Sequence, residues 1–116
     1  MHVVVAGISH KTAPLDLRER LALDEAAALH LSQALLDEGE ACETVALSTC
    51  NRTELYLWAR DSLAARQAAL AHLARHAGVE PRELEPSLYS YSGDGAISHL
   101  FRVTSSLDSM VVGEAQ

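Results

Sequence analysis

The sequence has few aromatic, cysteine and basic residues, and it contains no long apolar run. No run approaches the roughly 20 apolar residues that a membrane-spanning helix needs. The start, MHVVVAGISH, lacks the basic flank and the cleavage site of a secretion signal. The aromatic content of 4% argues against a surface for stacking nucleic-acid bases. Nine Lys and Arg residues against 16 Asp and Glu residues give a formal net charge of -7, which argues against non-specific binding to nucleic acid or anionic membranes. We therefore expect a cytoplasmic protein with no membrane contact.

The glycine and cysteine residues exclude two further features. The six glycines form neither G-x-G-x-x-G nor G-x-x-x-x-G-K, so no nucleotide phosphate loop is recognisable. The two cysteines cannot provide a disulfide framework. If Cys42 and Cys50 lay along one strand, they would be about 26 Å apart, beyond disulfide reach. We expect Cys42 to be structural.

The length and composition are those of one globular domain. With 116 residues, of which 48% are apolar, the chain can bury a core of its own. We expect one domain over residues 1–116. The final VVGEAQ has no polar tail and no helix stop, so we expect the chain to be cut within an element.

The pattern of apolar residues predicts an α/β (α+β) fold. Strands are expected at 2–8, 43–49, 53–60 and 88–92, and in the third of them Leu55, Leu57 and Ala59 alternate with Glu54, Tyr56 and Trp58. Helices are expected near 17–21, from the N-cap Asp24 to about 38, from 62 to 77, and from the cap Asp94 to about 107. This order predicts a ferredoxin-like split βαβ sandwich, an antiparallel sheet with helices on one face and an additional C-terminal helix.

The most distinctive local feature is Ser48-Thr49-Cys50-Asn51-Arg52, between two predicted strands. A cysteine on a tight connection is presented to solvent or to a cleft, and it is nucleophilic as the thiolate. Arg52 can supply a nearby positive charge or bind a substrate carboxylate with two hydrogen bonds. The alternative is that Cys50 is a small buried apolar residue.

His99 has two possible roles. At 100° per residue, the last helix places Ile97, Leu100, Phe101, Thr104 and Leu107 on one side. His99, Arg102 and Ser106 fall opposite, which predicts that they face solvent, away from the core. The alternative is that this polar face closes over the cysteine loop, with His99 as an acid, a base or the partner of a thiolate.

Two other histidine clusters are less informative. His72 and His76 have the i, i+4 spacing of metal ligands, but no third ligand is evident, and we expect no metal site. His10-Lys11-Thr12 either lines a cleft or forms a surface loop.

Three segments resemble the N-terminal catalytic domain of the glutamyl-tRNA reductase family. They are GISHKTAPLDLRERLAL, LSTCNRTELY and HLFRVTSSLDSMVVGEAQ, and together they span nearly the whole chain. The pairing of STCNR with LDSMVxGExQ is highly specific. The resemblance implies that Cys50 attacks the glutamyl ester of glutamyl-tRNA(Glu), forming a thioester that NADPH reduces to glutamate-1-semialdehyde. This reaction begins tetrapyrrole (porphyrin, haem) synthesis by the five-carbon route.

The resemblance also implies site residues, a cofactor and partners. His99 is expected near the nucleophile, and the substrate-binding positions are Thr49, Asn51, Arg52, Ser109, Glu114, Ala115 and Gln116. Members of this family also contain an NADPH-binding domain and a helical dimerisation domain, and both are absent from these 116 residues. We therefore expect the full-length enzyme to be a homodimer, and the fragment to be a monomer that carries out only the acyl-transfer step. The downstream aminomutase is a further expected partner. Two other functions remain open: a ferredoxin-like ligand-binding or regulatory module without chemistry, and a general thiol hydrolase.

Overall fold

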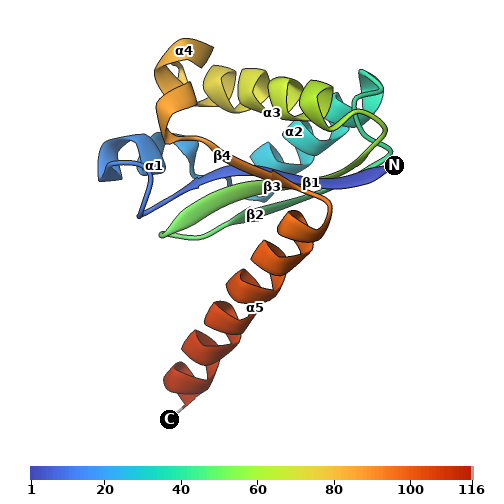
Figure 1. Cartoon of the computed structure of the whole chain (residues 1–116). Helices are drawn as coiled ribbons and strands as arrows, with labels where there is room; N and C mark the ends of the chain where they lie inside the picture. The colour runs from blue at the N-terminus through green and yellow to red at the C-terminus, as the bar shows by residue number, and fades with distance from the viewer. Residues whose placement is uncertain (116) are drawn as a thin grey trace.

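The fold is built on one antiparallel sheet with the strand order β2–β3–β1–β4 (Figure 1). The computed structural model describes the backbone of residues 1–115 and the side chains of residues 1–106. The strands are β1 (His2–Ser9), β2 (Glu43–Ser48), β3 (Arg52–Ala59) and β4 (Tyr89–Ser92). The helices are α1 (Leu15–Leu21), α2 (Glu25–Asp37), α3 (Ser62–Ala77), α4 (Pro81–Leu84) and α5 (Asp94–Ala115), with a 3-10 turn, η1, at Glu85–Ser87. This order and pairing confirm the predicted split βαβ arrangement.

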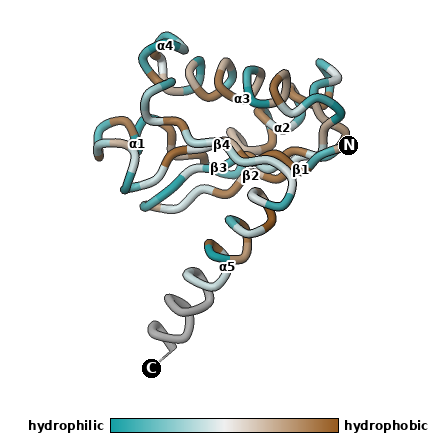
Figure 2. The backbone as a smooth tube through the Cα atoms, viewed as in Figure 1, coloured by the Kyte–Doolittle hydropathy of each residue, from teal (hydrophilic) through white to brown (hydrophobic). Residues whose placement is uncertain are grey.

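Helices α1, α2 and α3 cover one face of the sheet, and α5 leaves from the other face (Figure 1). The larger core lies under the three helices. It includes Val4, Ile8, Leu21, Leu35, Leu55, Leu57, Leu73 and Leu84. In Figure 2 the hydrophobic residues follow the strands and the helices that face them. A smaller cluster of Val5, Tyr56 and Ala96 joins the opposite face to the start of α5. No helix in the described part of the chain is long and apolar enough to cross a membrane.

Local capping signals place the ends of the two longer helices that cover the sheet. The Asp24 carboxylate accepts a hydrogen bond from the Ala27 amide at 2.8 Å and begins α2. Asp61 does the same for α3, which ends at Gly78 with a φ of 74°. The short α4 and η1 were not predicted. Asp94 is the first residue of α5 and not its cap, and α5 continues to Ala115 instead of ending near 107.

The predicted orientation of α5 is wrong. Ala96, His99 and Val103 pack against the sheet, while Phe101 on the apolar side is 68% exposed. Of the three polar residues expected to face solvent, His99 is buried against the sheet, while Arg102 and Ser106 are exposed. The reason is that small Ala96 allows close approach to the sheet, and His99 finds a buried carboxylate there. A prediction from helical periodicity takes account neither of the small size of Ala96 nor of the buried partner of His99.

Gly7 lets β1 and β3 approach closely at one point. It lies opposite Glu54 in the register of these strands, on the face toward α5. A Cβ atom at Gly7 would lie 2.9 Å from both Cα and Cγ of Glu54 and would clash with the Thr53 carbonyl oxygen. Glycine at this position thus leaves room for the Glu54 side chain to lie across β1.

We expect Gly7→Ala to lower the free energy of unfolding by about 1–3 kcal/mol, because two strands would have to separate. Urea denaturation measures this change. Gly95→Ala is the matched control, since a Cβ there would meet only Tyr91 Cβ at 3.7 Å. The control should change the free energy by less than about 1 kcal/mol. Equal effects of the two substitutions would contradict the proposed close approach.

Candidate active site

A polar pocket of about 470 Å³ lies where β1 ends and where β3 and β4 begin. Its lining comes from the turn after β1, from β3, from β4 and from α5. The lining residues are Ser9, His10, Lys11, Thr12, Arg52, Tyr89, Tyr91, His99, Arg102, Val103 and Ser106. Three of the nine Lys and Arg residues of this acidic chain are among them, and no carboxylate of a described residue is. The pocket therefore favours anionic ligands.

Glu54 lies beneath this pocket and is completely buried. Its Oε2 accepts hydrogen bonds from Tyr89 Oη at 2.5 Å, from Arg52 Nη1 at 3.4 Å and from His99 Nε2. Its Oε1 accepts a hydrogen bond from Tyr56 Oη at 2.8 Å. A buried charge is tolerated when it is hydrogen-bonded and paired, and Glu54 has four such partners.

These contacts shift the pKa values of three side chains. Burial alone would raise the pKa of the Glu54 carboxyl, but hydrogen bonds from Tyr89, His99 and Tyr56 outweigh it and hold that pKa below its usual value. Burial, and hydrogen bonding to the Glu54 carboxylate, raise the pKa of both tyrosine hydroxyls. Glu54 is therefore ionised at neutral pH, and the two tyrosines are neutral donors.

Glu54 also determines which nitrogen of His99 carries hydrogen. An ionised carboxylate only accepts hydrogen bonds, so His99 Nε2 must donate. The imidazole ring lies between two tyrosine rings, with centroid distances of 5.2 Å to Tyr89 and 5.0 Å to Tyr91. The orientation of the ring is thus fixed, and Nδ1 is left for a ligand or a proton.

Arg52 is held at one end of its guanidinium group. Nη1 contacts Glu54 Oε2 at 3.4 Å and Tyr89 Oη at 3.5 Å. Among the described residues, no hydrogen bond uses its Nη2 or Nε. Since the side chain is 18% exposed and lines the pocket, these donors are available to a carboxylate.

Cys50 lies at the tip of the turn between β2 and β3, and its side chain is exposed. The Thr49 amide donates to the Arg52 carbonyl at 2.8 Å, which closes the turn. Arg18 Nη1 donates to the Cys50 carbonyl at 3.3 Å, and the His10 amide donates to the Asn51 carbonyl at 2.8 Å. The predicted loop position is confirmed, and the alternative of a buried cysteine is wrong.

The structure brings only some of the predicted site residues together. Arg52 and His99 share the pocket and are joined through Glu54. Thr49, Cys50 and Asn51 form the neighbouring turn, but none of the three lines the pocket. Ser109, Glu114, Ala115 and Gln116 lie outside the residues whose side chains are described, so their predicted contacts with substrate stay predictions.

The remaining candidate residues have other positions. Cys42, which we expected to be structural, is exposed just before β2 and is a free thiol, as is Cys50. His72 Nε2 lies 3.0 Å from both carboxylate oxygens of Glu38, and His76 Nε2 lies 3.1 Å from the Ala22 carbonyl oxygen. The i, i+4 histidine pair thus ties α3 to the ends of α1 and α2. Within the described side chains, no group of three possible metal ligands occurs.

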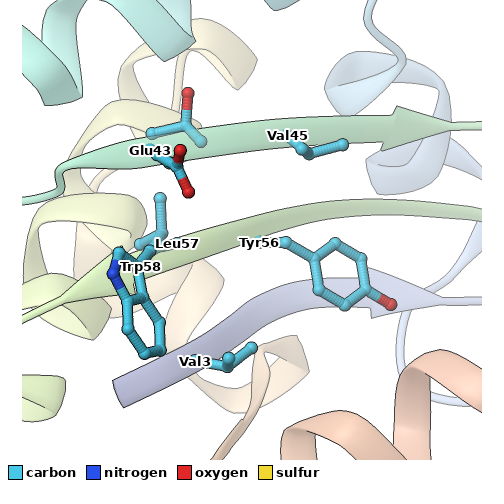
Figure 3. Close-up of a pocket in the computed structure, with 7 residues that line it drawn as sticks. Val3, Glu43, Val45, Tyr56, Leu57 and Trp58 are labelled. Carbon is cyan, nitrogen blue, oxygen red and sulfur yellow. The ribbon is translucent and has the colours of Figure 1, made fainter. Parts of the chain in front are cut away.

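A second hollow lies on the open part of the sheet, beside α5 (Figure 3). It has a volume of about 200 Å³ and is lined by Val3, Glu43, Thr44, Val45, Tyr56, Leu57 and Trp58. Trp58 pairs with Val3 across β3 and β1. This hollow contains no cysteine, histidine or cation, so the polar pocket is the better candidate for chemistry.

Comparisons with known proteins show the family to which this fold belongs. The family described as glutamyl-tRNA(Glu) reductase, N-terminal domain, matches residues 6–116. The chain belongs to the glutamyl-tRNA reductase family. Glutamyl-tRNA reductases of Geobacter metallireducens and Myxococcus xanthus are 47% and 49% identical to it over 116 residues, all of this chain but 27% and 25% of those proteins. The solved glutamyl-tRNA reductase of Methanopyrus kandleri matches 96% of this chain and 24% of that chain, with 27% identity and a TM-score of 0.63. The chain thus spans about a quarter of the length of these relatives.

Sequence reasoning missed Glu54, the residue that joins the pocket together in this member of the glutamyl-tRNA reductase family. The strand pattern identifies it only as one of three residues that alternate with the apolar positions. Two signals could have identified it: a carboxylate two residues before a tyrosine within an apolar strand, and a glycine within the apolar run of β1. Neither signal indicates which residue Glu54 contacts, because its partner His99 is 45 residues away in the sequence.

We expect Glu54→Gln to lower the free energy of unfolding by about 1.5–3 kcal/mol, because charge-assisted hydrogen bonds are lost. The loss should depend on pH. Since the folded-state pKa of Glu54 is lowered, its contribution is present above its unfolded pKa and disappears as pH falls through the folded pKa. Denaturation between pH 7 and pH 2 should therefore show the variant and the original protein converging in acid. A constant difference across this range would contradict the ionised carboxylate.

Proposed function

We propose that this chain is the acyl-transfer domain of a glutamyl-tRNA reductase, in which Cys50 captures glutamate from glutamyl-tRNA as a thioester. The observation that carries the proposal is the juxtaposition of an exposed cysteine turn with a cation-lined pocket. Arg52 belongs to both, since it closes the turn through its carbonyl and lines the pocket with its side chain. Membership in the glutamyl-tRNA reductase family supplies the substrate.

The proposed step is an ester-to-thioester exchange. The Cys50 thiolate attacks the carbonyl carbon of the glutamyl ester, and a C–S bond forms. The tetrahedral intermediate then loses the ribose oxygen of the tRNA, and the proton released by the thiol ends on that oxygen. We assign His99 Nδ1 to carry this proton, because Nε2 is bound to Glu54. No oxidant or reductant is needed for this half of the reaction.

The turn offers a donor to the oxyanion of that intermediate. The Thr49 and Asn51 amides already donate within the turn, to the Arg52 carbonyl and to Thr49 Oγ1. In the part of the chain that the structure describes, the Cys50 amide has no acceptor. A backbone N–H group adjacent to the nucleophile can stabilise a developing negative charge on the carbonyl oxygen.

Arg52 is the proposed receptor for the side-chain carboxylate of the substrate. Its guanidinium group keeps free donors on the pocket side while Glu54 fixes Nη1. A planar group with two parallel donors matches a carboxylate. The same contact would reject the amide analogue, since glutamine offers one acceptor and no charge.

NADPH does not fit the residues of this chain. The turn after β1 reads Ser9-His10-Lys11-Thr12 and carries no glycine-rich phosphate loop. We therefore derive no hydride step here, and we assign NADPH binding to the part of the longer relatives that this chain does not cover. Cytoplasmic location, a homodimeric enzyme and transfer of the product to the aminomutase belong to the same proposal.

We expect Cys50→Ser to abolish labelling when the protein is incubated with glutamyl-tRNA and without NADPH. Intact mass should show one glutamyl adduct on the original protein, labile to hydroxylamine, and peptide mapping should place it on Cys50. Cys42→Ser is the matched control, because Cys42 is equally exposed but lies at the other end of β2. Labelling that survives in Cys50→Ser, or a folded protein that is never labelled, would favour the binding module without chemistry.

We expect Arg52→Gln to reduce the preference for glutamyl over glutaminyl esters about 10- to 100-fold, the value of one charge-assisted pair. Small activated esters and the rate of Cys50 acylation measure this ratio. Arg60→Gln, just beyond β3, is the control for loss of one positive charge. An unchanged ratio in Arg52→Gln would favour a general thiol hydrolase.

A further inference from the structure

Two cations in the pocket take no part in the chemistry proposed above. Lys11 is the only lysine of the chain and lies in the turn after β1. Arg102 follows His99 by one turn of α5 and lines the same pocket. Both side chains are exposed, in contrast to Arg52 and His99. We refer to Lys11 and Arg102 as the outer cations.

No carboxylate among the described side chains neutralises the outer cations. Three arginines are paired: Arg20 lies 3.6 Å from Asp16, Arg66 lies 2.8 Å from Glu85, and Arg52 contacts Glu54. The other arginines without an ion pair among the described side chains lie outside the pocket; they are Arg18, Arg60, Arg75 and Arg82. Among the side chains that the structure describes, Lys11 and Arg102 form no ion pair. In a chain with a net charge of -7, this leaves a local positive field at one pocket.

The turn that carries Lys11 is held in place by hydrogen bonds. Thr12 Oγ1 accepts from the Ser9 amide at 3.0 Å, and the Lys11 amide donates to Ser9 Oγ at 3.2 Å. The neighbouring His10 amide is bound to the cysteine turn. The backbone of Lys11 is therefore held beside the cysteine turn, and its exposed side chain lines the pocket.

We propose that the outer cations bind phosphate groups at the 3′ end of the tRNA, and so seat the ester bond at Cys50. This inference rests on the proposed function, because that function places the glutamyl carboxylate on Arg52 and the ribose at the cysteine turn. In this proposal the nucleotides attached to that ribose extend over the exposed rim of the neighbouring pocket, where the outer cations lie. Phosphates are the anions they carry, and Lys and Arg are the usual residues that bind them.

This inference also explains how an acidic domain accepts a polyanion. The charge of the whole chain disfavours non-specific binding, while a few unpaired cations at the pocket bind the end of the tRNA that carries glutamate. Neutralising each phosphate contact contributes about 0.7 to the slope of log affinity against log salt for single-stranded nucleic acid. The number of contacts can therefore be measured.

The test compares Lys11→Gln and Arg102→Gln with the original protein in two assays. The first is equilibrium binding of deacylated tRNA over a range of salt concentrations. Each substitution should weaken binding several-fold at low salt and make the slope shallower by about 0.7. The second is the rate of Cys50 acylation, in which the ratio of glutamyl-tRNA to small-ester reactivity should fall at least fivefold. Lys11→Arg, which keeps the positive charge, should leave the salt dependence of binding and the reactivity ratio close to those of the original protein.

Arg82→Gln is the matched control, because Arg82 is an exposed cation on α4, outside the pocket. Equal effects of Arg82→Gln and Lys11→Gln would overturn the inference, since net charge alone would then explain them. Equal losses with the small ester and with glutamyl-tRNA would also overturn it, because the outer cations would then bind glutamate itself.

The two assays separate this inference from the proposed function. If no thioester forms but salt-dependent tRNA binding is lost in Lys11→Gln, the acyl-transfer proposal fails and the phosphate site stands. If the thioester forms and the binding slope is unchanged in both variants, the phosphate site fails alone. If the original protein does not bind deacylated tRNA, the phosphate site is likewise overturned.

Discussion

The site depends on one buried carboxylate. Glu54 has no exposed surface, and it is kept ionised by donors from two strands and one helix: Arg52 and Tyr56 on its own strand, Tyr89 on β4, and His99 on α5. Gly7 on β1 leaves room for its side chain. Burying a charge is costly unless it is paired, so these groups must be brought together for the fold to be stable. The need to pair the buried Glu54 carboxylate therefore also orients Arg52 and His99, the two pocket side chains to which we assign roles in the reaction.

Much of the fold could be predicted from local signals. Asp24 and Gly78 mark helix ends for local reasons. The Asp24 side chain accepts a hydrogen bond from an amide of the first turn of α2, and Gly78 readily adopts the left-handed backbone conformation that ends α3. The turn around Cys50 follows from two strand patterns separated by a few polar residues. The sheet order then follows from the sequence of elements, because few topologies satisfy short connections. Such features need no knowledge of distant contacts.

The parts that escaped prediction depend on distant contacts. The orientation of α5 follows from Ala96 and His99 meeting β3, and the apolar pattern of Ile97 and Phe101 indicated the opposite. Glu54 resembled a solvent-facing residue because only the tertiary structure supplies its partners. A prediction from helical periodicity places the most hydrophobic side of a helix toward the core. It therefore gives the wrong buried face for a helix that is held by a small residue and a polar network. This failure fell at the candidate site, where polar burial competes with the ordinary rule.

The central position of β1 has a consequence for synthesis on the ribosome. The strand is made before both of its neighbours in the sheet, β3 and β4, and its register runs from His2 opposite Ala59. At translation rates of 5–20 residues per second, the interval before β3 is complete is roughly 3–10 s. During that time a nascent chain presents an apolar, unpaired strand, a segment suited to recognition by chaperones or proteases. The abundance of such a protein in cells would then depend on how quickly β3 follows β1, as well as on its final stability.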